Sequence, residues 1–250
     1  ASGALHFKTP VAGTVTLFNS FTLDSAVTFE AALTGSLKID GGNINSYMNG
    51  VDFNGAVTGS VSITTTIASG SHGVRVHSTG AGIAAGATFK IVDSDISSAA
   101  VSGSGVRVTA LHPGTLSIIK TTINTLDSAV YFLAAPTGGL RMTDCTATST
   151  GDYALKLVAG ITGGVVDVTR GSLTGAGGID VNGAVDATSR LQLNHASVTA
   201  GTGHGVHGVG AVGGLLSVTG GSITAAAGNA VQLDADTAKN LVTYTRLFML

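Results

Sequence analysis

A short apolar–x–apolar phrase recurs along the chain every 22 to 28 residues, and this repeat limits the possible folds more than any other feature. Its copies are VTL at 15–17, LKI at 37–39, VSI at 61–63, FKI at 89–91, LSI at 116–118, LRM at 140–142, VDV at 166–168, LQL at 191–193 and LSV at 216–218. Self-similarity at a fixed period of this length is typical of solenoids and related repeat architectures.

Each repeat contains two further short elements. The first is a polar–apolar–polar phrase, such as NIN at 43–45, DIS at 95–97, TIN at 122–124 and SIT at 222–224. The second is a small residue followed by apolar–x–apolar, as in AVTF at 26–29, GVDF at 50–53, GVRV at 73–76 and 105–108, AVYF at 129–132, ALKL at 154–157, GIDV at 178–181 and AVQL at 230–233. A period of two residues in all three elements indicates three short strands per repeat.

These elements predict an all-β fold, a right-handed parallel β-helix of about ten coils in which like residues stack turn upon turn. At the usual strand spacing the rod would be about 45–50 Å long. No segment carries a helical stripe of ten or more residues, which argues against helical and leucine-rich repeats. We expect one domain spanning 1–250, with 1–10 and 241–250 as incomplete terminal coils.

Composition excludes several classes of function. The net charge is −2, with 12 basic residues scattered along the chain, which argues against a nucleic-acid partner. Only 10% of residues are charged, but no run of 18 apolar residues occurs, so no membrane span is predicted. Cys145 is the sole cysteine, which rules out a disulfide framework and fits a secreted or cell-surface chain. We expect no cofactor.

The recurring phrases of the type G-S-I-T and G-V-x-V, with the Gly, Ala, Thr and Ser richness, resemble passenger domains of bacterial autotransporters and related β-helical surface adhesins. The resemblance covers about 11–239 and concerns architecture, since the phrases are stacking chemistry. It implies an extracellular rod and carries no site residue over.

Charged side chains are expected to pair between neighbouring coils. Aligning the repeats places Asp93, Lys120, Asp144 and Arg170 at one corner of four successive turns. The same alignment sets Asp52 beside Arg75, Lys156 beside Asp180 and Arg141 beside Asp167, so that opposite charges alternate. Such alternation avoids like-charge repulsion and is the structural interpretation. Asp93 and Asp95 are the only close carboxylates that could bind a cation, and two carboxylates make a poor calcium site. No metal ligand or catalytic residue is assigned.

The seven histidines are His6, His72, His77, His112, His195, His204 and His207, and a surface or corner position is expected for each. His72 and His204 are at equivalent repeat positions. His204 and His207 are three apart, so in an extended strand they would face opposite sides. Cys145 aligns with Ser94, Thr121, Gly171, Ala196 and Gly221, which indicates a small packing residue rather than a nucleophile.

Outward polar pairs predict two parallel rows on one face: Asn43/Asn45, Asp95/Ser97, Thr122/Asn124, Thr146/Thr148, Ser172/Thr174, Ser197/Thr199 and Ser222/Thr224. Ice-binding solenoids resemble this arrangement, although they carry regular Thr-x-Thr rows and these rows are mixed. A solvated sheet surface is the main interpretation, with ice binding and a shallow carbohydrate contact face as alternatives.

The sequence therefore predicts a non-enzymatic structural or adhesive rod, at the cell surface or outside the cell. Its partners would be a second copy stacked head-to-tail, adjoining coils of a longer chain, or surface glycans, because unpaired strand edges at the ends of a solenoid recruit other strands. The alternative is a polysaccharide lyase or hydrolase, including tailspike-like depolymerases, which would need a groove of aligned carboxylates.

Overall fold

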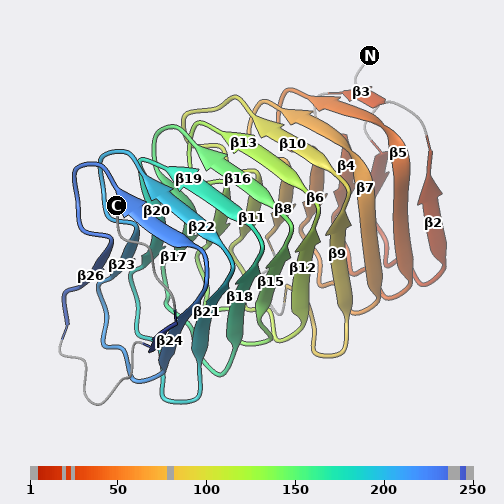
Figure 1. Ribbon diagram of the computed structural model, residues 1–250. Helices are drawn as coiled ribbons and strands as arrows, with labels where there is room; N and C mark the ends of the chain where they lie inside the picture. Colours follow the sequence, from red (N-terminus) through yellow and green to blue (C-terminus); the bar gives the residue numbers. More distant parts are fainter. Residues whose placement is uncertain (1–4, 19–20, 24–25, 78–81, 236–242, 246–250) are drawn as a thin grey trace.

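The chain winds as a parallel β-solenoid, a right-handed coil that runs from the N-terminal end to the C-terminal end of a rod (Figure 1). The computed structural model describes residues 5–18, 21–23, 26–77, 82–235 and 243–245. Within those ranges regular structure consists of strands, and there is no helix with the length and hydropathy to cross a membrane. The predicted fold class is confirmed.

A ten-stranded parallel sheet, here called the first sheet, forms one side of the rod. It contains the strands expected from the third repeat element: β1 (Leu5–Phe7), β4 (Val27–Phe29), β6 (Val51–Phe53), β8 (Val74–Val76), β11 (Val106–Val108), β14 (Val130–Phe132), β17 (Tyr153–Leu157), β20 (Gly177–Val181), β23 (Val206–Gly208) and β26 (Val231–Leu233). Each strand pairs in parallel with the strand one turn later, which gives about nine turns rather than the expected ten.

The other two strands of each turn belong to one 17-stranded sheet. A corner between these two strands divides the sheet into two faces. Its front face comprises β2 (Thr14–Leu17), the first halves of β5 (Ser36–Ser46) and β7 (Ser60–Ser69), β9 (Thr88–Val92), β12 (Thr115–Ile119), β15 (Leu140–Thr143), β18 (Val165–Thr169), β21 (Arg190–Asn194), β24 (Leu215–Thr219) and β27 (Thr243–Thr245). Its upper face comprises β3 (Phe21–Leu23), the second halves of β5 and β7, β10 (Asp95–Ser98), β13 (Thr122–Thr125), β16 (Thr146–Ser149), β19 (Ser172–Gly175), β22 (Ser197–Ala200) and β25 (Ser222–Ala225).

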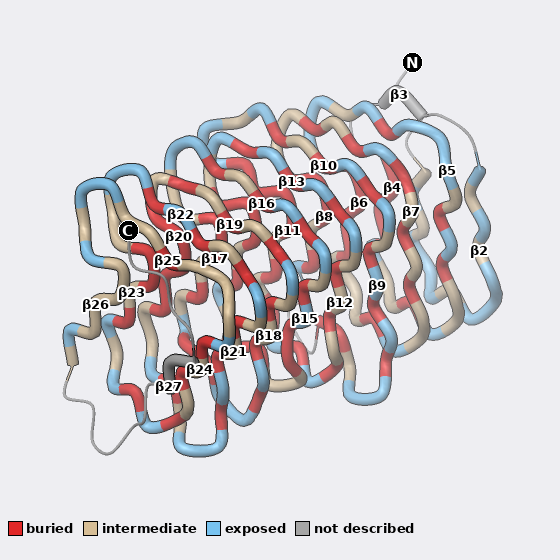
Figure 2. Tube along the Cα trace, viewed as in Figure 1, coloured by how far each residue is buried: buried red, intermediate tan, exposed pale blue. Residues whose placement is uncertain are grey.

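Columns of like apolar side chains fill the interior between the three faces. Buried residues recur at matching places on successive turns (Figure 2). In the front face Ile118 lies between Ile91 and Met142 of the neighbouring turns, and all three are fully buried. Near the N-terminal end Phe7 and Phe29 stack with ring centroids 4.5 Å apart, and Phe53 follows at 5.2 Å. Because each turn covers the apolar surface of the next, no turn needs a core of its own.

The longest turn runs from β8 to β11, where the paired residues Val74 and Val106 are 32 positions apart, compared with 24 for the next pair, Val106 and Val130. The extra residues form two insertions, one after β8 and one between β10 and β11. Described residues of both insertions, His77 and Ser102, border the same part of the first sheet, and this part carries the candidate site.

Candidate functional site

The outward surface of the first sheet presents one side chain per turn in an unbroken row. From the N-terminal end the row reads His6, Thr28, Asp52, Arg75, Arg107, Tyr131, Lys156, Asp180, His207 and Gln232, each being the Cα partner of the next. The apolar–x–apolar pattern of the strands produces the row, since only the middle residue of each phrase points to solvent. Five of the seven ion pairs among the described residues include a member of this row.

Asp52 and Arg75 form a bidentate ion pair, as their alignment predicted. The Arg75 Nε and Nη2 atoms donate to the two Asp52 carboxylate oxygens at 2.8 and 2.7 Å. Asn49 also donates to Asp52 at 3.1 Å, and Arg75 reaches Asn54 at 3.3 Å. The Asp52 side chain is 7% exposed, so the pair is largely shielded from solvent. Arg75 is therefore held in place by a neutralising partner.

Arg107 is the next residue in the row, directly beside Arg75, and this breaks the expected alternation of charge. Its guanidinium lies over the ring of Tyr131, 4.6 Å from the ring centroid. In contrast to Arg75, it forms no ion pair with any residue that the structure describes. The undescribed residues 78–81, which follow His77, read Ser-Thr-Gly-Ala and include no acid. Within the part of the chain that the structure describes, Arg107 is thus a cation that stacks on an aromatic ring and has no acidic partner.

A hollow of about 430 Å³ lies over the two arginines. It is lined by His72, Arg75, His77, Ser102, Arg107, Thr109 and Leu133. His77 stands at the start of one insertion and Ser102 lies in the other, so the additional residues of the longest turn build the walls of the hollow. Insertions on a solenoid commonly gather on the binding face, and here both border one cavity.

His72 is held in a neutral form at the rear of this hollow. Its Nδ1 atom accepts a hydrogen bond from the Ser104 backbone N–H at 3.0 Å, so the proton of the neutral ring is on Nε2. Burial, reinforced by the positive charges of Arg107 and Arg75, lowers the pKa of His72 to about 4. The His77 Nδ1 atom lies 2.7 Å from the Thr109 hydroxyl. The lining is therefore rich in hydrogen-bond donors and carries positive charge.

Further along the row the ion pairs differ from those expected. Lys156 and Asp180 are Cα partners, but the Lys156 Nζ atom bonds to Asp152 at 2.9 Å. Asp180 instead lies 3.0 Å from the His207 Nδ1 atom, while the His207 Nε2 atom lies 2.9 Å from Asp234. Burial raises the pKa of Asp180. Pairing between strands therefore brings charged residues close together, and the length of each side chain decides which of them form an ion pair.

His204 and His207 do not face opposite sides, contrary to the prediction. Their ring centroids are 5.0 Å apart. The alternation rule fails because His204 lies in the bend that precedes β23, outside the extended strand. The predicted equivalence of His72 and His204 is confirmed, since the His204 Nδ1 atom accepts the Asn229 backbone N–H at 3.0 Å, as His72 accepts that of Ser104.

The corner between the front and upper faces carries the predicted stack of charged residues. Asp93, Lys120, Asp144 and Arg170 occupy it on successive turns, and His195 continues the column. The Arg170 Nε and Nη2 atoms donate to Asp144 at 2.7 and 2.8 Å, which lowers the pKa of Asp144.

The remaining aligned carboxylates have modest roles. Arg141 and Asp167 are Cα partners, but Asp167 accepts hydrogen bonds from Thr169 and Asn194, each at 3.0 Å, and no ion pair joins it to Arg141. Asp93 and Asp95 are both exposed. Among the described residues no group of three or more histidine, cysteine or acidic side chains could hold a metal ion.

Cys145 has the predicted packing role. It is 2% exposed, and its thiol donates to the Ile118 carbonyl at 3.1 Å and to the Thr143 carbonyl at 3.3 Å. Ser94 at the equivalent position makes the same two kinds of contact, to Ile63 and Val92. Burial raises the pKa of the Cys145 thiol, which keeps it protonated and unreactive.

His112 contradicts the expectation that every histidine lies at the surface or at a corner. It is fully buried, with its ring 4.8 Å from that of Phe132, and neither ring nitrogen makes a hydrogen bond to a described residue. Burial lowers its pKa to about 4, an effect that the nearby Gly139 backbone opposes. The sequence does carry a signal for this burial, because H-P-G at 112–114 is the counterpart of L-T-G at 33–35, V-T-G at 57–59 and I-T-G at 161–163, whose first residues are all fully buried.

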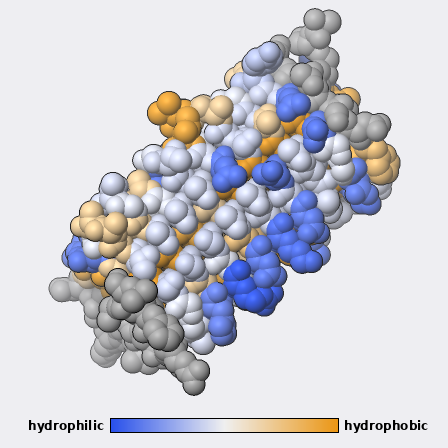
Figure 3. Space-filling model, turned by 45° about the horizontal axis from the view of Figure 1, so that its top comes forward, coloured by the Kyte–Doolittle hydropathy of each residue, from blue (hydrophilic) through white to orange (hydrophobic). Residues whose placement is uncertain are grey.

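The two polar rows predicted for the upper face are present and in register from Asp95 and Ser97 onward, whereas Ala68 stands between Asn45 and Ser97 and interrupts the second row. One runs through Asp95, Thr122, Thr146, Ser172, Ser197 and Ser222, the other through Ser97, Asn124, Thr148, Thr174, Thr199 and Thr224. Figure 3 shows pale rows along the rod, separated by a narrow orange line of more hydrophobic residues. The surface is regular but chemically mixed.

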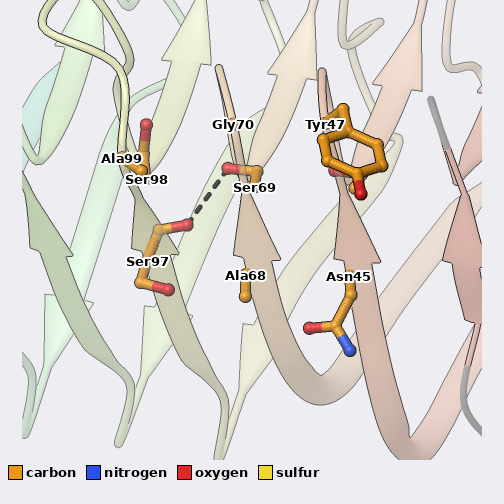
Figure 4. A pocket seen from close by; sticks show the side chains of 9 residues that line it. Asn45, Tyr47, Ala68, Ser69, Gly70, Ser97, Ser98 and Ala99 are labelled. Atoms are coloured by element: carbon orange, nitrogen blue, oxygen red, sulfur yellow. Dashed lines mark hydrogen bonds between the residues drawn. The ribbon is translucent and has the colours of Figure 1, made fainter.

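A second hollow, of about 450 Å³, lies at the edge of the upper face (Figure 4). Small residues such as Ala68 and Ser97 form its floor, and Tyr47, which is 80% exposed, stands at one side. Ser69 donates to the Ser97 carbonyl at 3.0 Å beneath it. No charged residue lines this hollow. It therefore offers fewer strong polar contacts to a ligand than the hollow over Arg75 and Arg107.

Comparisons with family models, curated proteins and solved structures find no match to this chain. The resemblance to autotransporter passenger domains therefore rests on the repeat phrases and the winding alone. The class of protein defined by the fold is the parallel β-solenoid.

Proposed function

We propose that the protein is a non-enzymatic structural or adhesive rod that acts outside the cell or at its surface. The observation that carries the proposal is the continuous stack of parallel pairings in the first sheet, from Leu5 to Leu233. Backbone hydrogen bonds in such a stack run along the rod axis, so force along the axis is shared among several bonds per turn. A rod of about nine turns would be about 43 Å long at the usual strand spacing.

End-to-end addition is the mechanism by which such a rod would lengthen. β1 and β26 occupy the two edges of the first sheet. An edge strand presents unpaired N–H and C=O groups and is a template for another strand. In this proposal the added strand comes from a second copy, stacked head-to-tail, or from adjoining turns of a longer passenger.

The β1 edge allows a specific test, because its hydrogen bonds have a known direction. Leu5 N–H donates to the Ala26 carbonyl and the Phe7 carbonyl accepts from Glu30, so both residues bond toward β4. Alternate residues of a parallel strand bond to opposite neighbours, so the His6 backbone faces the open edge. His6→Pro removes the donor of that residue without removing a β1–β4 hydrogen bond.

We expect the wild-type chain to form longer rods as its concentration rises, measured by sedimentation velocity and small-angle X-ray scattering. His6→Pro should stay a single rod, and the matched variant His6→Thr should lengthen as the wild type does. A wild-type chain that remains a single rod at all concentrations would contradict head-to-tail addition. Release of reducing ends or unsaturated products from a panel of acidic polysaccharides would contradict the non-enzymatic assignment.

A further inference from the structure

We propose that the hollow over Arg75 and Arg107 is a binding site for the oxyanion group of an acidic polysaccharide. The inference rests on the proposed adhesive role and deepens it by naming the class of ligand. Its central observation is that the guanidinium groups of Arg75 and Arg107 lie on adjacent strands, whereas the one carboxylate that pairs with them among the described residues, that of Asp52, bonds to Arg75.

The charge balance of this pair favours a bound anion. Adjacent strands are about 4.8 Å apart, and like charges placed opposite each other on a sheet are destabilising. Asp52 engages Arg75 through both of its oxygens and is nearly buried, so it is committed to that residue. Arg107 retains its charge without a counter-ion among the described residues. An external anion would complete the pattern of alternating charge seen elsewhere in the row.

The groups around Arg107 suit an oxyanion in particular. The neutral His72 ring carries its proton on Nε2, because Nδ1 accepts the Ser104 N–H, and Ser102 adds a hydroxyl donor. No acidic side chain lines the hollow to repel an anion. A guanidinium forms paired hydrogen bonds with carboxylates and related oxyanions, and these bonds are stronger than those between neutral groups.

The size and surroundings of the hollow point to a sugar rather than a free inorganic ion. About 430 Å³ is in the range of cavities that hold small organic ligands. Leu133, which is 44% exposed, supplies an apolar wall beside the donors. The hollow also lies on a sheet that continues along the rod in both directions, so a chain with several sugar units could lie along the row while one acidic unit enters.

Isothermal titration calorimetry with three oligosaccharides of similar length tests the site: an oligogalacturonate, its methyl ester, and a sulfated dextran fragment. The first and third carry carboxylate and sulfate groups, so they distinguish the two sources of an oxyanion, and the ester is the neutral control. We expect binding of at least one acidic probe and none of the ester, with affinity that falls as salt concentration rises.

Arg107→Gln should weaken that binding about tenfold or more, the usual effect of losing a charged hydrogen-bonding partner. Arg107→Lys should retain part of the affinity. Arg170→Gln is the matched control, since it removes a more exposed cation that is already paired with Asp144 at the corner of another face, and it should change affinity less than twofold. Far-UV circular dichroism of each variant verifies that the fold is intact.

Three results would overturn the proposal: no binding of either acidic probe by the wild-type chain, equal binding of the methyl ester, or equal losses in Arg107→Gln and Arg170→Gln. Binding is also measured on the His6→Pro variant, which should not add end to end, so that assembly does not affect the result.

Arg107→Gln should form longer rods with concentration as the wild type does. Failure of oxyanion binding and failure of head-to-tail addition can therefore be told apart.

Discussion

The corner between the front and upper faces shows how single residues adapt to the winding. Asp93, Lys120, Asp144, Arg170 and His195 have φ angles of 46 to 55°, in the left-handed region that side chains other than glycine seldom occupy. The stack compensates for this strain, because the N–H of each corner residue donates to a carbonyl one turn later, as Asp93 does to Ile119 at 3.0 Å. The corner is therefore specified by its neighbours along the axis more than by its own residue type.

Buried histidines make the stability of the rod depend on pH. The pKa of His112 is about 4 in the folded protein, below its ordinary value of 6.5. Between these two values the unfolded chain takes up a proton that the folded chain does not, so stability falls as pH falls from 6.5 to 4. Between pH 7 and pH 4 the free energy of unfolding should fall by about 3 kcal/mol less in His112→Leu than in the wild type. Urea unfolding at the two pH values measures the difference.

His6→Gln is the control for this titration, because His6 is exposed and paired only with Glu30 at 3.1 Å. It should change the pH dependence by less than about 1 kcal/mol. At pH 7 His112→Leu should also be more stable than the wild type, by about 1–3 kcal/mol, because it removes two buried nitrogens without partners. Equal acid sensitivity in wild type and His112→Leu would show that His112 is not buried as described.

At the scale of the single strand, the alternation of inward and outward residues decides which substitutions are tolerated. In β12 Ile118 points into the core and is fully buried, whereas Ser117 points outward between Lys90 and Arg141 of the adjacent turns. We expect Ile118→Asp to prevent folding, because an unpaired carboxylate in the core costs several kcal/mol. Soluble yield, circular dichroism and thermal unfolding measure the effect.

Ser117→Asp places the same charge one residue away and should fold normally, since the new carboxylate would lie near two cations. The comparison isolates the direction of the side chain from its chemistry. An Ile118→Asp variant as soluble and heat-stable as its parent would contradict the assignment of the inward columns.

The strands could be predicted from the sequence because their signal is local. The phrase G-V-R-V at 73–76 and 105–108 defines both strands and their mutual register, and the structure pairs Val74 with Val106. The site could not be predicted in the same way. The two G-V-R-V phrases place Arg107 beside Arg75, but the hollow over them depends on the insertions that carry His77 and Ser102, whose paths the repeat does not specify.

At the scale of the whole molecule, each turn contacts only the turns before and after it. Stability in such a stack is close to a sum of terms for turns and for their interfaces, so a terminal turn is held on one side only. We expect amides of β12 and β15, near the middle, to exchange with deuterium more slowly than those of β1 and β26 in the dilute 250-residue chain. Uniform protection along the rod would contradict this local picture of stability.

The same measurement at high concentration bears on assembly. If rods add head to tail, the edge strands gain partners, and protection of β1 should rise with concentration while that of β12 stays constant. His6→Pro should show no such rise in β1.

The sequence by itself determined the winding: three short strands per repeat, the inward columns, the corner that stacks Asp144 with Arg170, and the small residue at Cys145. These features repeat at a regular spacing, so one turn predicts the next. Only the tertiary structure decided the approach of His204 to His207, the choice of Asp152 by Lys156, and the hollow over Arg107. Each of these depends on a bend, an insertion or the reach of a side chain, where the period is broken and the repeat carries no information.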